Sequence, residues 1–121
     1  MKEPVWIDER DTRSVHDRLL ALHGGATGLR DDGLLKSALA RPHQRFAYAE
    51  STDIRELAPA YTVGIVRDHP FADGNKCTGF VVGILFLELN GHRWRGASHG
   101  EPTPPKQFFV AYRSGRRCGE I

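Results

Sequence analysis

An almost wholly apolar run from Gly79 to Leu89 constrains the fold of this chain more than any other feature. It follows directly on a polar segment, from His69 to Thr78, that carries a histidine, a carboxylate, an amide and a lysine. Buried polar groups need hydrogen-bonding partners, so a polar cluster beside a core element is unfavourable unless function requires it. Such conflicts are expected where chemistry is done. The two stretches together predict an active-site loop that leads into a buried helix.

The residue types of the loop are typical of a site that binds and transfers phosphate groups. Histidine is the side chain that titrates nearest neutrality, so His69 is the natural proton acceptor. The carboxylate of Asp73 suits a hard cation such as Mg²⁺. Asp73 or Gly74 caps the next helix, whose first amides, including those of Asn75 and Lys76, favour an anion. This set predicts phosphoryl or nucleotidyl transfer. A plain helix–helix turn with a capping aspartate stays open as the alternative.

The same segment resembles the signature of a known family. The stretch from His69 to Thr78 reads HPFADGNKCT, which matches the pattern H-x-F-x-D-x-N-K-R-T at all but its arginine. This is the pattern of the Doc-like, or death-on-curing, toxins of the Fic/Doc family. Lys76 stands where Fic AMP-transferases usually carry glycine. Two further stretches, from His23 to Pro42 and from Leu87 to Arg93, are similar to the family in order and spacing, so the resemblance covers roughly residues 14 to 95.

The resemblance implies an all-α fold, a compact domain of five to six helices around a central buried helix. It implies a toxin that moves the γ-phosphate of ATP, with Mg²⁺, to a protein hydroxyl, in this family a threonine of elongation factor Tu. The second implied partner is a cognate antitoxin, whose C-terminal segment occupies a groove near the active site. By this resemblance, His69 is the catalytic base and Asp73 the magnesium ligand. The implied ATP-phosphate contacts are Arg67, Gly74, Asn75, Lys76 and the position of Cys77.

Cys77 is the main departure, because the family has arginine at this position. A guanidinium binds phosphate through two charge-assisted hydrogen bonds, which a thiol cannot form. By analogy with one lost oxyanion-hole donor, the change costs about 2–4 kcal/mol. That corresponds to roughly a hundred- to thousandfold in rate. Three interpretations stay open: a weakened toxin, a degenerate one, and a redox-sensitive one, since a thiol beside a lysine at a helix N-terminus is reactive.

Two other functions remain as alternatives. One is a Fic-like AMP-transferase, in which the α-phosphate is attacked, and Lys76 argues against it. The other is a catalytically inert module of the same fold that still engages an antitoxin, which Cys77 and an atypical tail favour. For Arg67, a solvated helix residue is the alternative to a phosphate contact.

Composition limits the remaining classes. The 121 residues, with 40% hydrophobic content, suit one domain spanning 1–121. A net charge of +2 gives no case for direct binding of nucleic acid or membrane. The N-terminus lacks a signal-peptide pattern and the apolar run is too short to span a bilayer, so a cytoplasmic location is the simplest interpretation. Residues 97–121 form the atypical tail, with a short helix predicted from Lys106 to Tyr112; we hypothesise that it is out of frame or unusually diverged.

Periodicity and capping residues predict the helices. The expected ranges are Asp8 to His23, Asp31 or Asp32 to about Arg41, Asp53 to Asp68, and Gly74 to about Asn90. Pro42 is expected to stop the second helix, and Pro59 either starts or kinks the third. The last helix is apolar all round and is the expected central one. Gln44 to Thr52 is ambiguous.

Two other features are given structural roles. His16, on the first helix, is interpreted as a hydrogen-bonded packing residue rather than a catalytic one. The stretch from Gly24 to Gly28 follows a helix, not a strand, and lacks the ending of a P-loop, so it is interpreted as a helix–helix connection. The histidines show no paired spacing of the kind that a structural zinc site requires.

Overall fold

The computed structural model describes residues 3–48 and 53–92, and these contain four α-helices and no strand. The helices are α1 (Glu9–His23), α2 (Asp32–Tyr48), α3 (Ile54–Asp68) and α4 (Asn75–Leu89). The predicted all-α fold is confirmed, with four helices in the described ranges against the five to six expected. The ambiguous residues 49–52, the tail 97–121 and its predicted helix lie outside the described residues.

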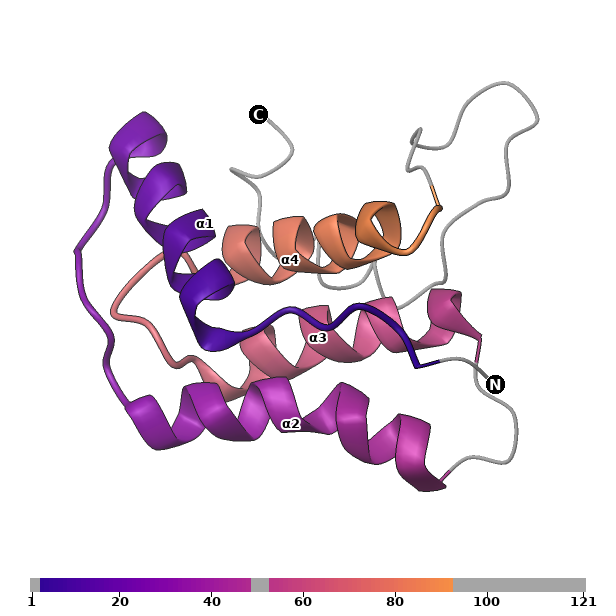
Figure 1. Ribbon diagram of the computed structural model, residues 1–121. Coiled ribbons are helices and arrows are strands. Elements are labelled where there is room, and N and C mark those ends of the chain that lie inside the picture. The colour runs from indigo at the N-terminus through magenta and orange to yellow at the C-terminus, as the bar shows by residue number, and fades with distance from the viewer. Residues whose placement is uncertain (1–2, 49–52, 93–121) are drawn as a thin grey trace.

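The helices are arranged in layers with α3 in the middle. Figure 1 shows α3 between α2 and α4, while α1 crosses one end of the stack beside α4. The expected central helix, α4, packs against α3 and α1, and α3 packs against α2 and α4, so both lie inside the stack of described helices. The core lies between these helices and contains their buried side chains Leu35, Leu39, Leu57, Tyr61, Ile65, Val82 and Phe86. Two residues outside the helices, Ile7 and Phe71, complete it.

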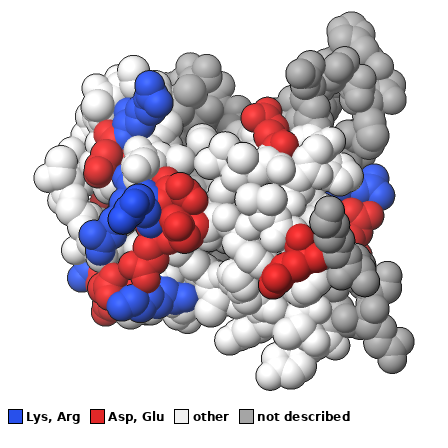
Figure 2. Space-filling view, in the orientation of Figure 1, with Lys and Arg blue, Asp and Glu red and all other residues white. Residues whose placement is uncertain are grey.

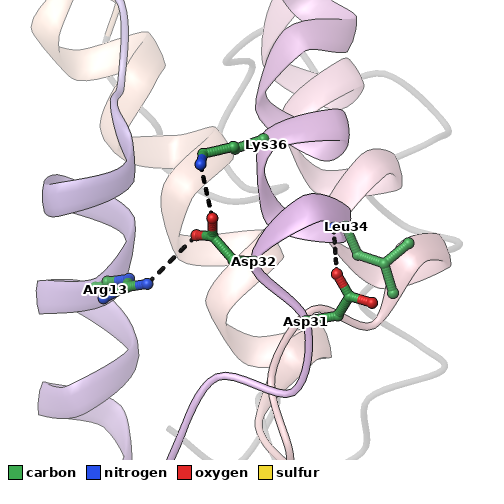
Figure 3. Close-up of polar contacts among 5 residues, drawn as sticks. All are labelled: Arg13, Asp31, Asp32, Leu34 and Lys36. Carbon is green, nitrogen blue, oxygen red and sulfur yellow. Dashed lines mark hydrogen bonds and ion pairs between the residues drawn. The ribbon is translucent and has the colours of Figure 1, made fainter.

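Helix ends follow the capping residues. The side chain of Asp8 accepts a hydrogen bond from the Asp11 amide at 2.9 Å, and the Asp11 side chain faces back to the Asp8 amide in a capping box. The Asp11 amide lowers the pKa of Asp8. Gly24 ends α1 with a positive φ of 80°. At α2, the Asp31 carboxylate accepts from the Leu34 amide at 3.1 Å (Figure 3).

The predicted stop at Pro42 is wrong, because α2 continues through it to Tyr48. Proline has no amide, so the carbonyl of Ala38 receives no helical hydrogen bond from position 42. Pro42 is buried, and α3 approaches that same carbonyl at Gly64, where an added Cβ would lie only 3.0 Å from it. Burial at this helix contact offsets the missing bond. In α3, Pro59 is likewise interior, since the helix begins at Ile54 under an Asp53 cap.

Gly64 is a position where a side chain should be harmful. We expect Gly64→Ala to destabilise the protein by about 1–3 kcal/mol, because the new methyl group would meet the backbone of α2. Thermal unfolding should shift down by roughly 4 °C or more for each kcal/mol lost. Gly33→Ala is the matched control, because the nearest atom to its Cβ, at 3.2 Å, is the movable end of the Asp31 side chain. Equal melting temperatures for the two variants would contradict the close contact of α2 and α3.

The N-terminal segment is held on the bundle by side chains. The amide group of Asn90 pairs with the backbone of Val5, accepting from its N–H at 2.7 Å and donating to its carbonyl at 3.0 Å. The Ile7 amide donates to the Tyr61 hydroxyl at 3.0 Å. Burial raises the pKa of Tyr61 to about 12, so this hydroxyl stays protonated. Val5 to Ile7 is therefore an extended segment that pairs with side chains of the helical bundle.

Charged side chains of both signs are mixed over α1 and the start of α2 on the face shown in Figure 2. One group joins these two helices: Asp32 lies 3.5 Å from Arg13 and 2.7 Å from Lys36 (Figure 3). Lys36 lowers the pKa of the Asp32 carboxyl. Within the described ranges, every helix is too short or too polar to span a bilayer.

Candidate active site

His69 ends α3 in a conformation that few non-glycine residues adopt. Its φ of 50° and ψ of 56° lie in the left-handed region, while its amide still donates to the carbonyl of Ile65 at 3.1 Å. Histidine tolerates this region better than most side chains, but the strain still amounts to about 1–3 kcal/mol. The side chain is exposed. An exposed, strained histidine at a helix end is a typical position for a functional group.

Asn75, at the start of α4, holds the loop together from within. Its Oδ1 accepts from the Phe71 amide at 2.9 Å and its Nδ2 donates to the Phe71 carbonyl at 3.0 Å. These two bonds determine which way the amide group points. The same Nδ2 lies 3.2 Å from Nδ1 of His69. The residue is only 5% exposed, and its amide group orients His69 and Phe71.

The contact with Asn75 determines the proton position on the His69 ring. Because Nδ2 can only donate, Nδ1 of His69 must accept, and the neutral ring then carries its proton on Nε2. In this state Nε2 is a hydrogen-bond donor. Acceptance of a proton at Nε2 requires the ring proton to transfer to Nδ1 and the bond from Asn75 to break. One hydrogen bond contributes about 1 kcal/mol, so this change is small beside a chemical barrier.

The N-terminus of α4 has the features of an anion site. Gly74, with a φ of 78°, is its N-cap, and glycine has no side chain of its own to bond the first amides. Of the two predicted caps, Gly74 is therefore the one observed. Lys76 and Cys77 lie half-buried in the first turn. A helix N-terminus directs amides and a positive dipole end toward a bound anion.

Asp73 precedes this helix end with an exposed side chain. Its Oδ1 accepts from the Gly74 amide at 2.8 Å, and its Oδ2 lies 3.4 Å from the amide of Ala26. No group of three histidine, cysteine or acidic side chains able to hold a metal occurs in the part of the chain described. Magnesium usually keeps several waters and uses one or two carboxylates with substrate phosphates. A single exposed carboxylate beside an anion site fits that mode.

The connection between α1 and α2 supports the loop from outside. The Pro70 carbonyl accepts from the amides of Arg30 and Asp31 at 2.7 and 3.0 Å, and the Ala72 amide donates to Gly28. The Arg30 guanidinium donates to the carbonyls of Asp68 and His69 at 3.1 and 2.8 Å. The connection therefore holds both ends of the loop, a role the sequence-based interpretation missed.

The connection also lies directly on Asp73. A Cβ on Gly25 would fall 2.8 Å from its Oδ2, so a larger residue would displace the Asp73 carboxylate, and the φ of 127° also favours glycine here. The sequence contained one signal of this support. The stretch from His23 to Pro42 also resembles the family, although it lies outside the loop.

Arg67 and Cys77 are the two remaining residues of the predicted site. Arg67 is exposed on the last turn of α3, and none of the described residues forms a hydrogen bond or ion pair with its side chain. The sulfur of Cys77 is disulfide-bonded in this structure.

Comparison with known proteins agrees with the geometry. A sequence profile of the Fic/DOC family matches residues 6–87. The protein kinase doc of Escherichia phage P1 is 35% identical over 85 residues, which cover 70% of this chain and 68% of that protein. The toxin Doc of Mycolicibacterium smegmatis is 39% identical over 70 residues, or 56% of this chain and 53% of that protein. The chain belongs to the Fic/Doc family and, in sequence, to its Doc-like branch.

Proposed function

We propose that this protein transfers the γ-phosphate of ATP, with Mg²⁺, to a hydroxyl group of a protein, at a rate lowered by Cys77. By family expectation the acceptor is a threonine of elongation factor Tu. The observation that carries the proposal is the placement of His69, held by Asn75, beside the N-terminus of α4, where Gly74 is the N-cap. The similarity to a protein named protein kinase doc supports the choice of kinase chemistry.

The residues divide the work as follows. The acceptor oxygen attacks the γ-phosphorus, the bond from that phosphorus to the β-phosphate oxygen breaks, and ADP leaves. Nε2 of His69 takes the hydroxyl proton once the ring carries its own proton on Nδ1. Gly74 and the α4 N-terminus receive the phosphates, Lys76 contributes positive charge, and Arg67 adds a second cation. Asp73 would hold magnesium, which neutralises phosphate charge when bound.

Transfer of AMP is the second candidate, because the same helix end can receive an α-phosphate. Gly74 at the N-cap is compatible with it, whereas Lys76 replaces the glycine usual in such enzymes. An inert module is the third, and the missing guanidinium at Cys77 favours it. The three candidates differ in the group that becomes attached to the acceptor: the γ-phosphate for the kinase, AMP for the AMP-transferase, and nothing for the inert module.

A cognate antitoxin is the expected partner. The structure has a groove of about 730 Å³ along α2 and α3 that combines apolar residues with Arg41, Arg45, Glu56 and the exposed Tyr48. Arg41 also bonds the Asp68 carboxylate at 2.7 Å, next to His69. A segment bound in this groove would therefore lie on the support of the loop, which is a reasonable position for an inhibitor.

Label transfer tests the proposal. Purified protein, Mg²⁺ and elongation factor Tu are incubated in parallel with ATP labelled at the γ- or the α-phosphate, with the factor omitted as a control. We expect label from the γ-phosphate only. Label from the α-phosphate would identify an AMP-transferase. Absence of label from both, at a protein concentration that detects a thousandfold-weakened enzyme, would contradict both transferase activities on this substrate.

A further inference from the structure

His16 is a buried polar residue that the chemistry above does not use. It lies in the middle of α1 with 1% of its surface exposed, on the inward stripe that it shares with Thr12 and Leu20. Burial of an imidazole is unfavourable unless its polar atoms are hydrogen-bonded. Its partners should therefore show why the position is not occupied by an ordinary apolar side chain.

The ring of His16 contacts the active-site loop in two ways. Its Nε2 lies 2.7 Å from the carbonyl oxygen of Asp73, and because a carbonyl only accepts, this nitrogen carries the proton. One ring face stacks on Phe71, with a centroid distance of 3.8 Å and an interplanar angle of 10°. A Cβ on Gly74 would lie 3.6 Å from the same Nε2. His16 therefore packs beneath the turn into α4.

The orientation of the peptide between Asp73 and Gly74 determines where the Asp73 carboxylate and the Gly74 amide point. The peptide that joins Asp73 to Gly74 has its oxygen bonded inward to His16 and its N–H bonded to the Asp73 carboxylate. With the carbonyl held toward α1, the carboxylate stays on the exposed side next to the N-terminus of α4. Rotation of this one peptide would turn the carboxylate and the Gly74 amide away together.

Stacking alone does not account for a histidine here. A phenylalanine would stack on Phe71 equally well and would avoid the unfavourable burial of two nitrogens. The other ring nitrogen has only a distant partner, since Nδ1 lies 3.8 Å from the Asp17 carboxylate, whose side chain is 81% exposed. The hydrogen bond to Asp73 is thus the feature that requires histidine.

We propose that His16 is a positioning residue for the metal–nucleotide complex. It holds the Asp73 peptide so that the carboxylate and the α4 N-terminus face the same ligand. The inference rests on the proposed function, because that function supplies the ligand. Partners that orient a metal-binding carboxylate typically change metal affinity or activity by about 10- to 100-fold when removed.

Two substitutions separate the hydrogen bond from the packing. His16→Phe keeps the stacked ring and lacks the N–H, whereas His16→Gln keeps an N–H donor and lacks the ring. Thr12→Val is the matched control, because Thr12 is buried on the same stripe but bonds the Asp8 carbonyl and not the loop. Should His16→Phe fail to fold, His16→Leu replaces it.

The measurement is the affinity of each protein for Mn²⁺ in the presence of a non-hydrolysable ATP analogue. Binding is monitored through the electron paramagnetic resonance signal of Mn²⁺ in solution. All proteins are compared well below their melting temperatures. We expect His16→Phe to weaken this affinity about 10- to 100-fold, and His16→Gln and Thr12→Val to stay within about threefold of the unchanged protein. In the ligand-free protein, the Gly74 amide signal should move in His16→Phe more than in His16→Gln.

Each other outcome is decisive. Equal affinity in all variants would assign His16 to core packing alone, and so would equal weakening in His16→Phe and His16→Gln. An affinity loss in Thr12→Val as large as that in His16→Phe would mean that any disturbance of α1 has this effect. If the unchanged protein binds no metal–nucleotide complex, the proposed function fails together with this inference. The measurement on the unchanged protein therefore separates failure of the proposed function from failure of the role given to His16.

Discussion

Replacement of His69 by asparagine should lower γ-phosphate transfer by about 10²- to 10⁴-fold, the usual contribution of a general base. Asparagine is chosen because it tolerates the left-handed backbone at this position, with its φ of 50°, better than alanine does. The exposed side chain makes one hydrogen bond to Asn75, so the free energy of unfolding should fall by only about 1 kcal/mol. The initial rate of labelled phosphate transfer and the melting temperature measure the two effects.

His92→Asn is the control for this change. His92 is also exposed, and it follows the far end of α4, away from the loop. Its replacement should leave the rate unchanged. In a bacterium that lacks the antitoxin, growth arrest should disappear with His69→Asn and persist with His92→Asn. A rate that survives in His69→Asn within a few-fold would show that His69 is not the base.

Local features of the sequence predicted most of the helices. The helices predicted from Asp8 to His23 and from Asp53 to Asp68 are observed from Glu9 and Ile54, with Asp8 and Asp53 as their N-caps, because capping depends on a side chain and the few amides next to it. These predictions succeed where the deciding contacts lie within one turn of the residue concerned.

Predictions failed where distant segments decide. Pro42 is accommodated inside α2 because Gly64, on another helix, lets the backbones approach there, and nothing near Pro42 signals this. The side chain of Asn75 turns inward because Phe71 and His69 offer partners. The residue type alone cannot distinguish an amide that binds a ligand from one that binds the backbone. The residues of the loop could therefore be predicted from the sequence, whereas the support from Arg30 is evident only in the tertiary structure. His16 is the hydrogen-bonded packing residue that was predicted, but its partner, the Asp73 carbonyl, could not be predicted.

The second large effect concerns Cys77, which lies in the first turn of α4 where the family pattern has arginine. We expect Cys77→Arg to raise the rate of γ-phosphate transfer by roughly a hundred- to thousandfold. The reason is a guanidinium that forms two charge-assisted bonds to phosphate as negative charge redistributes in the transition state. Since Cys77 is only half-buried, the larger side chain can extend toward solvent. Loss of the disulfide bond should lower the melting temperature, equally in Cys77→Ala, so rates are compared well below the melting temperatures of all variants.

Two further variants isolate the cause. Cys77→Ala removes the sulfur and its disulfide bond without adding charge, so it should keep the original rate. Cys77→Lys adds a point charge that cannot bind two oxygens at once, and its gain should fall well short of that of arginine. Equal gains in the alanine and arginine variants would show that the disulfide-bonded sulfur restrains the site. An unchanged rate in all three would mean that Lys76 and the end of α4 already supply what the arginine provides elsewhere in the family. A gain confined to arginine would instead show that this chain retains an intact loop, base and helix end around one missing contact.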